Sequence, residues 1–399
     1  MPKYDVSDLL VKRFQSDRFI NELDVDDSQL ALMKDARTKV RNTLKSAFTR
    51  AKSNDEYLCR MEETDRQVFQ NIEPRFWPQG SFAYGTQNVP AQIPPQQLDL
   101  DDGVYLPLEA MRDRPIVNKE IFFSIVDEAL KELAREQGWR FIEKNTCARL
   151  EISHDIHIDV PLYAIPVEKF DDLQKAAGRS TLKRSVLNES DDLSLRRMLA
   201  GEKVYLALRD TGHWVESDPI QIQAWFENEQ IVFGERLTNV CRYLKAWRDN
   251  TWPSGGPTSI ALMICTWEVF RDSDREFYSD SDALLQVVKA LPEKLSVDVR
   301  NPVSEKEIIF PRNVSPEHIA DIIRAANLLS SDVVGALQQA SSPIQVVDIF
   351  RLYWGARFPR RPDWVSLAGA IAAAVVTSTP IDAQPEPEIG TMRSGHRSG

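Results

Sequence analysis

Two acidic residues that follow a Gly-Ser pair are the part of this sequence best suited to chemistry. Gly80 and Ser81 are followed, eighteen residues after the serine, by Asp99-Leu100-Asp101. Side chains alternate between the two faces of an extended strand, so Asp99 and Asp101 point the same way while Leu100 points into the core. Two such carboxylates repel each other without a cation, and carboxylate oxygens are ligands that Mg²⁺ prefers. The spacing predicts a divalent-metal site, with the Ser81 hydroxyl and nearby backbone N–H groups holding a triphosphate that shares the metal.

A third carboxylate lies in a later segment, 155–159, which alternates strictly between polar and apolar residues. If that strand neighbours the strand of Asp99, Asp159 completes the site of an ion that activates an attacking hydroxyl, while a second ion neutralises leaving pyrophosphate. An isolated Asp-x-Asp pair is more often a solvated turn, but the third aspartate favours a nucleotidyltransferase site. His154 and His157 receive no role, because a partly buried strand histidine is more common than a metal ligand.

A phosphate-binding wall is expected from a second region of the chain. Lys245 lies beside the apolar stripe of an amphipathic helix, and Ser259 follows a Gly-Gly-Pro-Thr turn as the expected N-cap of the next helix. Taken alone, Lys245 would be an ordinary surface lysine. Because helix N-termini bind anions, the two residues together predict a phosphate clamp.

The elements that position these residues indicate an α+β chain in which a mixed lobe is followed by a helical lobe. We expect residues 1–215 to form the mixed lobe, 216–378 the helical lobe and 379–399 a flexible tail poor in apolar residues. Strands are expected at 139–143, 147–152, 156–162 and 204–208, an exposed loop at 89–97, a polar loop with a short helix at 168–202 and a turn at 212–219. Helices are expected at 26–51, 56–70, 118–136, 219–229, 234–249, 258–271, 281–293, 315–339 and 343–354.

Charge and composition exclude several classes of protein. The 399 residues carry a formal net charge of −11, and no run of five or more Lys or Arg occurs, which argues against a protein that binds duplex DNA. The four cysteines are scattered without zinc spacing, which indicates a reducing cytosol and no structural zinc. The start of the chain has no signal-peptide pattern, and the apolar run at 365–376 spans about half a membrane. We expect a cytoplasmic protein without a membrane partner.

Four segments taken together resemble the bacterial cGAS/DncV-like nucleotidyltransferases, and in particular their dinucleotide cyclase branch. The resemblance extends over roughly residues 30–360. The segments are QGSFAYGT at 79–86, LDLDDG at 98–103, HIDVPLY at 157–163 and RYLKAWRD at 242–249.

This resemblance implies a Pol-β-like lobe and a helical lobe with the active site in the cleft between them. It also implies synthesis of a cyclic dinucleotide, 3′,3′-cyclic GMP-AMP, from ATP and GTP with Mg²⁺ or Mn²⁺, as a second messenger for an effector in CBASS antiphage defence. The implied metal ligands are Asp99, Asp101 and Asp159. The implied nucleotide contacts are Gly80, Ser81, Tyr84, Arg149, Ser217, Asp218, Lys245 and Ser259. The chain lacks the zinc-ribbon pattern and basic platform of the animal synthase, so DNA is not an expected activator.

The end of the sequence suggests a partner. Relatives in operons with ubiquitin-like E1/E2 conjugation proteins are joined to targets through their last residue, and a flexible segment that ends in Gly399 suits such an active site. An ordinary disordered end is the alternative.

Two other functions remain open from the residues alone. A template-independent RNA nucleotidyltransferase, of the poly(A) or CCA-adding type, would use the same acidic site, but the acidic charge and the lack of a basic stripe weigh against it. A non-catalytic sensor module would keep the fold, but it would be expected to have lost at least one of the three aspartates.

Overall fold

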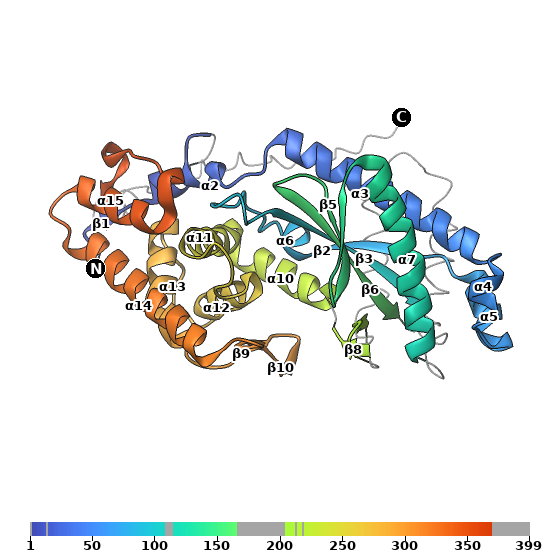
Figure 1. Cartoon of the computed structure of the whole chain (residues 1–399). Coiled ribbons are helices and arrows are strands. Elements are labelled where there is room, and N and C mark those ends of the chain that lie inside the picture. The colour runs from blue at the N-terminus through green and yellow to red at the C-terminus, as the bar shows by residue number, and fades with distance from the viewer. Residues whose placement is uncertain are drawn as a thin grey trace, which may run out of the picture.

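A mixed sheet carries the acidic residues, and a group of helices packs beside it (Figure 1). The computed structural model describes residues 2–12, 15–107, 115–165, 204–211, 214–217 and 219–368. The expected α+β class is confirmed. The expected segment at 168–202 and the tail at 379–399 lie outside the described residues, and so does most of the apolar run at 365–376.

The sheet places two parallel strands at its centre. In spatial order its main strands are β2 (Arg75–Gln79), β3 (Leu98–Pro107), β6 (Ile156–Ile165), β5 (Cys147–Glu151) and β4 (Arg140–Glu143). Two short strands extend it beyond β6, namely β7 (Tyr205–Ala207) and β8 (Trp214–Glu216). Strands β3 and β6 are parallel, whereas the other pairs are antiparallel. The carboxylates of two distant segments can therefore share one face.

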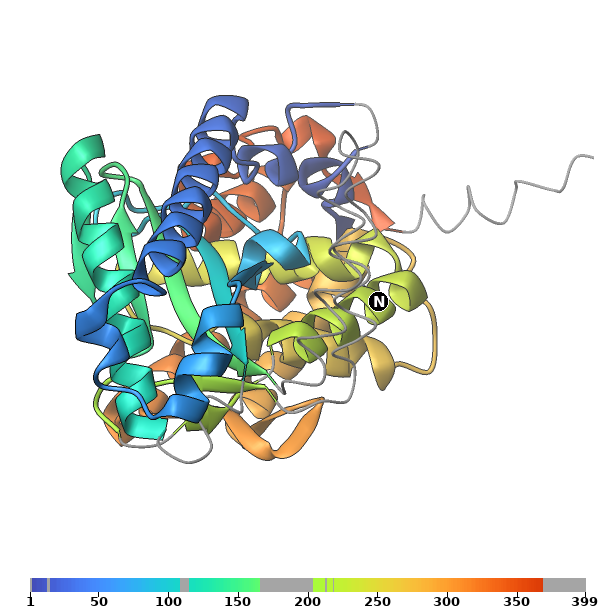
Figure 2. The ribbon, with the colours of Figure 1, turned by 90° about the vertical axis from the view of Figure 1, so that its right-hand side faces the viewer.

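Two long helices, α3 (Asp27–Ala51) and α7 (Pro115–Gln137), cover the face of the sheet opposite to the acidic residues. They lie side by side in Figures 1 and 2. The N-cap of α3 is Asp26, whose side chain accepts hydrogen bonds from the backbone N–H groups of Ser28 and Gln29. Its buried stripe is the expected one: Met33, Ala36, Val40, Leu44 and Phe48. These residues share one core cluster with Leu100 and Ile158, so the aspartates that alternate with those two residues point away from the helices.

The helical half contains the six helices expected from periodicity. They are α10 (Pro219–Phe233), α11 (Glu235–Thr251), α12 (Ser259–Arg271), α13 (Asp280–Lys294), α14 (Pro316–Gln339) and α15 (Pro343–Trp354). Serine side chains cap three of them, at Ser279, Ser315 and Ser342. Figure 1 shows α10 between the sheet and the other helices, where Trp77 Nε1 of β2 donates to Gln223 Oε1 of α10 at 3.0 Å.

The N-terminal segment belongs to the helical core. Strand β1 (Tyr4–Asp5) pairs with β11 (Ser366–Leu367), and the short helices α1 (Ser7–Leu10) and α2 (Phe19–Glu22) bury apolar residues in the same cluster as α11 and α15. The Phe19 ring stacks on Tyr243 with centroids 5.7 Å apart. This placement differs from the expectation that the first residues accompany the sheet. The boundary near residue 215 stays a prediction.

Two local expectations outside the site were wrong, and one hairpin was not expected. The helix expected at 56–70 is two helices, α4 (Asp55–Leu58) and α5 (Glu63–Asn71), because Arg66 Nε donates to the Leu58 carbonyl oxygen and satisfies the end of α4. The turn expected at 212–219 contains β8, whose Trp-Val-Glu sequence pairs with β7. The structure also has an unexpected hairpin of β9 (Val299–Asn301) and β10 (Ser304–Phe310), whose turn begins where Asn301 Oδ1 accepts from Val303 N.

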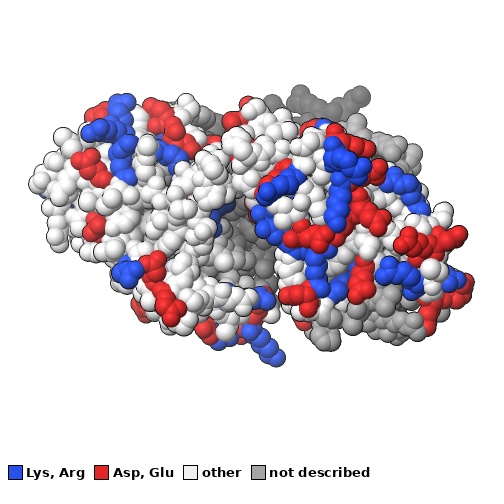
Figure 3. Space-filling view, viewed as in Figure 1, with Lys and Arg blue, Asp and Glu red and all other residues white. Residues whose placement is uncertain are grey.

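Charged side chains of both signs are interspersed on the face shown in Figure 3, and the surface is hollowed between the two halves. Within the described residues, no helix has the length and apolar character needed to cross a membrane.

Candidate active site

Parallel pairing of β3 and β6 brings the acidic residues together. Asp101 lies opposite Asp159 in the register, and Asp99 lies opposite His157. One ligand atom from each of Asp99, His157 and Asp159 lies within 4.8 Å of the others. The expected adjacency of the two acidic strands is therefore confirmed.

The close approach of Gly80 to Asp101 explains why a glycine precedes the serine. Gly80 opens the short helix α6 (Gly80–Tyr84) with φ +64°, and a Cβ at this position would lie 2.2 Å from Asp101 Oδ2. Burial raises the pKa of Asp101 well above its usual value, and the neighbouring charges of Asp99 and Asp159 raise it further. A divalent cation would relieve this repulsion, and an oxygen donor set of three carboxylates fits Mg²⁺ or Mn²⁺.

Arg149 on β5 holds Asp159. Its Nε and Nη2 donate to Asp159 Oδ1 and Oδ2 at 2.6 and 2.7 Å. Burial opposes the charge of Arg149, but these bonds and the charge of Asp99 outweigh burial and raise its pKa. Because each carboxylate oxygen has a second lone pair, Asp159 is oriented by Arg149 and still has capacity to bind a cation.

The opposite wall of the site comes from α11 and α12. Burial lowers the pKa of Lys245 to about 8, against the opposing effect of Asp249. Arg248 Nη1 donates to Ser259 Oγ at 2.7 Å. The expectation that Ser259 is the N-cap is wrong by one residue, because the Thr258 side chain accepts from Ala261 N and Ser259 is the first helical residue.

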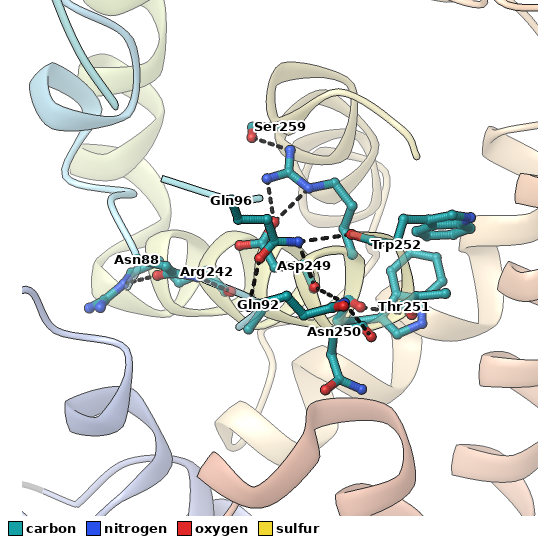
Figure 4. Close-up of polar contacts among 12 residues, drawn as sticks. Asn88, Gln92, Gln96, Arg242, Asp249, Asn250, Thr251, Trp252 and Ser259 are labelled. Atoms are coloured by element: carbon teal, nitrogen blue, oxygen red, sulfur yellow. Dashed lines mark hydrogen bonds and ion pairs between the residues drawn. The ribbon is translucent and has the colours of Figure 1, made fainter. Parts of the chain in front are cut away.

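The segment at 89–97 joins the two walls, and it is not the exposed loop that its prolines and glutamines predict. Gln96 Nε2 donates to the carbonyl oxygens of Asp249 and Trp252 at 2.7 and 2.8 Å (Figure 4). Gln92 Nε2 donates to those of Asp249 and Asn250 at 2.9 and 3.1 Å. Both glutamines thus satisfy carbonyl groups at the end of α11, and only Pro94 and Pro95 of this segment are exposed.

A cavity of about 470 Å³ lies between these walls. It is lined by eight of the residues expected from sequence: Gly80, Ser81, Tyr84, Asp99, Asp101, Arg149, Lys245 and Ser259. Asp159 adjoins it through its contact with Arg149. Ser217 is not among the lining residues, and Asp218 lies outside the described residues.

The lining residues to which sequence reasoning gave no role include three with polar groups suited to a site: Gln97, His157 and Arg248. The alternation of the strand places His157 on the same face as Asp159, but sequence reasoning gave it no role because strand histidines are seldom ligands. Arg248 lies in the same helix as Lys245, three residues later, a spacing that places both on one side.

Both halves of the chain match models of one protein family. Residues 74–163 match the nucleotidyltransferase domain described as "Cyclic GMP-AMP synthase DncV-like", and residues 234–366 match "Cyclic GMP-AMP synthase, C-terminal domain". These matches include β2, β3, β5 and β6 of the sheet and α11 to α15 of the helical half.

Individual relatives agree with the family models. The chain is 34% identical over 348 residues to a cyclic GMP-AMP synthase of Escherichia coli strain TW11681, which covers 83% of this chain and 77% of the relative. It is 35% identical over 352 residues to the Vibrio cholerae cyclic GMP-AMP synthase, and this match covers 85% of this chain and 79% of the relative.

Solved structures share the arrangement. The V. cholerae DncV cyclic AMP-GMP synthase in complex with the linear intermediate 5′ pppA(3′,5′)pG superposes with a TM-score of 0.77 at 28% identity, covering 92% of this chain and all of that one. A point mutant of the same enzyme in complex with ATP, GTP and 5MTHFGLU2 gives a TM-score of 0.75 at 28% identity and the same coverage. The resemblance seen in the sequence and the Pol-β-like fold that it implies are confirmed: the chain belongs to the DncV-like family of cyclic GMP-AMP synthases.

Proposed function

We propose that this protein is a metal-dependent nucleotidyltransferase that joins ATP and GTP into 3′,3′-cyclic GMP-AMP. One observation carries the proposal. The register of β3 and β6 sets Asp159 beside Asp99 and Asp101, which line one wall of a cavity whose other wall presents Lys245 and Ser259. Carboxylates facing cationic and hydroxyl groups across a cleft can hold a metal and the triphosphate that shares it. The named relatives make the same class of product.

Asp99, Asp101 and Asp159 would hold Mg²⁺ or Mn²⁺, which when bound neutralises charge on the reacting phosphates and lowers the pKa of an attacking hydroxyl. Asp159, held in orientation by Arg149, would face the 3′-hydroxyl of one nucleotide and accept its proton. Lys245 would bind the triphosphate of the other nucleotide through its ammonium group. The Ser259 hydroxyl, held by Arg248, would contact the same phosphates.

The reaction consists of two phosphodiester-forming steps of the same kind. In each step a 3′-oxygen bonds to the α-phosphorus of the other nucleotide, the bond from that phosphorus to the bridging oxygen breaks, and pyrophosphate leaves. The first step yields a linear dinucleotide that keeps one triphosphate. That product must turn over in the cavity so that the second 3′-hydroxyl reaches the remaining α-phosphorus and closes the ring.

Incubation with all four labelled nucleoside triphosphates and Mg²⁺ or Mn²⁺, followed by chromatography and nuclease P1 digestion, tests the proposal. We expect a product that needs both ATP and GTP and that nuclease P1 degrades, as it does 3′,5′ linkages. An Asp99→Asn, Asp101→Asn double variant should be inactive but folded. Extension of labelled RNA instead of a small product would establish the poly(A) or CCA-adding alternative, and full activity of the double variant would refute the mechanism.

The cellular setting is a separate part of the proposal. The family resemblance supports a cytoplasmic role in CBASS antiphage defence, with a downstream effector that binds the product. E1/E2 conjugation at Gly399 stays a prediction, and this residue lies outside the described part of the chain. Deletion of Gly399 should abolish conjugation in cells and leave the activity of the purified enzyme unchanged; conjugates that persist would contradict it.

A further inference from the structure

His157 points into the acidic site from β6 and has no hydrogen-bond partner on that side. The residue is 6% exposed, and its Nε2 atom lies 2.9 Å from Asp99 Oδ1. Although the two atoms are close, their angles do not make a hydrogen bond, and neither atom has another partner among the described residues. Burying a polar atom without a partner costs folding free energy, so these two atoms indicate a binding site for a group that interacts with both.

A hydrogen bond on the other side of the ring fixes the orientation of the ring. Gln97 Nε2 donates to the carbonyl oxygens of His154 and Ser153 at 3.2 and 3.5 Å, which orients its amide. Gln97 Oε1 then lies 3.0 Å from His157 Nδ1. An amide oxygen only accepts, so Nδ1 carries a proton and donates it. Nε2 is then the ring nitrogen that faces the carboxylate of Asp99.

We propose that His157, through Nε2, is a nitrogen ligand in the divalent-metal site together with Asp99 and Asp159. His157 Nε2 and Asp99 Oδ1 lie 2.9 Å apart, and both are buried atoms without a hydrogen bond, so one cation could be bound by both. Adjacent ligands of an octahedral ion at about 2.1 Å are separated by about 3.0 Å, which matches this distance. The ligand atoms of Asp99, His157 and Asp159 lie within 4.8 Å of one another. They would have to move only slightly closer to match the roughly 4.2 Å between opposite ligands of such an ion.

A nitrogen ligand changes which metal the site prefers. Imidazole binds Mn²⁺ better than Mg²⁺, for which oxygen ligands are suited. Gln97 would act as a positioning residue, because a hydrogen bond to the other ring nitrogen fixes both tautomer and orientation in metal-binding histidines. The inference deepens the proposed function, since it rests on the same metal site.

The test uses the full chain with Mn²⁺ alone and without nucleotide. Mn²⁺ affinity is measured by loss of the free-ion electron paramagnetic resonance signal, and electron spin-echo envelope modulation detects ¹⁴N bound to Mn²⁺. We expect ¹⁴N modulation in the unmodified protein, its loss in His157→Gln and at least a tenfold weaker Mn²⁺ affinity, with Mg²⁺ affinity changed less. Gln97→Met should weaken Mn²⁺ binding about tenfold to a hundredfold.

His154→Gln is the matched control, because the His154 side chain is 80% exposed and lies three residues away on the same segment. It should keep both the affinity and the ¹⁴N modulation. Absence of ¹⁴N modulation in the unmodified protein, or its persistence in His157→Gln, would overturn the inference. Asp99→Asn separates the two proposals: if it abolishes Mn²⁺ binding while ¹⁴N is never seen, the metal site stands and only the nitrogen ligand is wrong.

Discussion

Replacement of Gly80 by alanine tests whether the turn before Ser81 exists to admit the Asp101 carboxylate. Both Gly80 and Gly85 have left-handed φ angles, +64° and +68°, so an alanine at either position should lose about 1–2 kcal/mol of folding free energy. Only at Gly80 does the added Cβ meet a neighbour, 2.2 Å from Asp101 Oδ2, whereas nothing lies within 4 Å of a Cβ at Gly85. The pair therefore separates backbone strain from displacement of the carboxylate.

The size of the catalytic effect follows from the distance. To reach ordinary contact, Asp101 Oδ2 must move by about 1 Å, and a misplacement of that size costs roughly a hundredfold in rate, or about 2.7 kcal/mol. Pyrophosphate release from ATP and GTP measures the rate, and urea unfolding measures stability. We expect Gly80→Ala to lose about a hundredfold in kcat and Gly85→Ala less than threefold, with similar losses of stability. Equal kcat losses in the two variants, or full activity of Gly80→Ala, would refute the reasoning.

Three further predictions concern the surroundings of the site. Gln96→Met removes three hydrogen bonds, to the carbonyl oxygens of Asp249 and Trp252 and from Gln92 N, so it should lower the free energy of unfolding by about 3 kcal/mol and reduce kcat. Gln70→Met loses one bond, to the Lys52 carbonyl oxygen in the sheet half, and should cost at most about 1 kcal/mol without changing kcat. Arg41→Met leaves the fully buried Asp102 carboxylate unpaired and should cost about 3–5 kcal/mol in urea unfolding; a cost below 1 kcal/mol would contradict this. As pH rises through about 8, Lys245 loses its proton and its attraction for phosphate, so kcat/KM should fall, and Lys245→Met should have a lower kcat/KM without that step.

The metal-binding wall could be predicted because it depends on local pattern. Alternation alone places Asp99 and Asp101 on one face and does the same for His157 and Asp159. The apolar stripes of the long helices are equally local, which explains why α3 and the six helices of the second half were expected close to their observed positions. The same alternation identified His157 as a neighbour of the acids, but the general rarity of histidine ligands outweighed it.

Other features depend on partners far away in the sequence. Gln92 and Gln96 resemble polar loop residues until the carbonyl groups of α11, about 150 positions later, come into contact with them. The first strand gives no local sign that it pairs with Ser366 and Leu367. The choice of Thr258 over Ser259 as N-cap depends on the exit angle of the preceding turn, which two adjacent hydroxyl residues leave undecided.

The pairing of β1 with β11 sets an order of events during synthesis. Residues 4–23 are made before the rest of the core in which they pack, because its other buried members begin at residue 226 and the strand partner lies at residues 366 and 367. At roughly 5–20 residues per second, the segment waits about 20–70 s for Ser366 and Leu367 to be added. The sheet half can fold during this interval with its aspartates in place, while the wall that carries Lys245 stays incomplete. A ribosome-bound chain should therefore have no cyclase activity until residues 366 and 367 have left the ribosome.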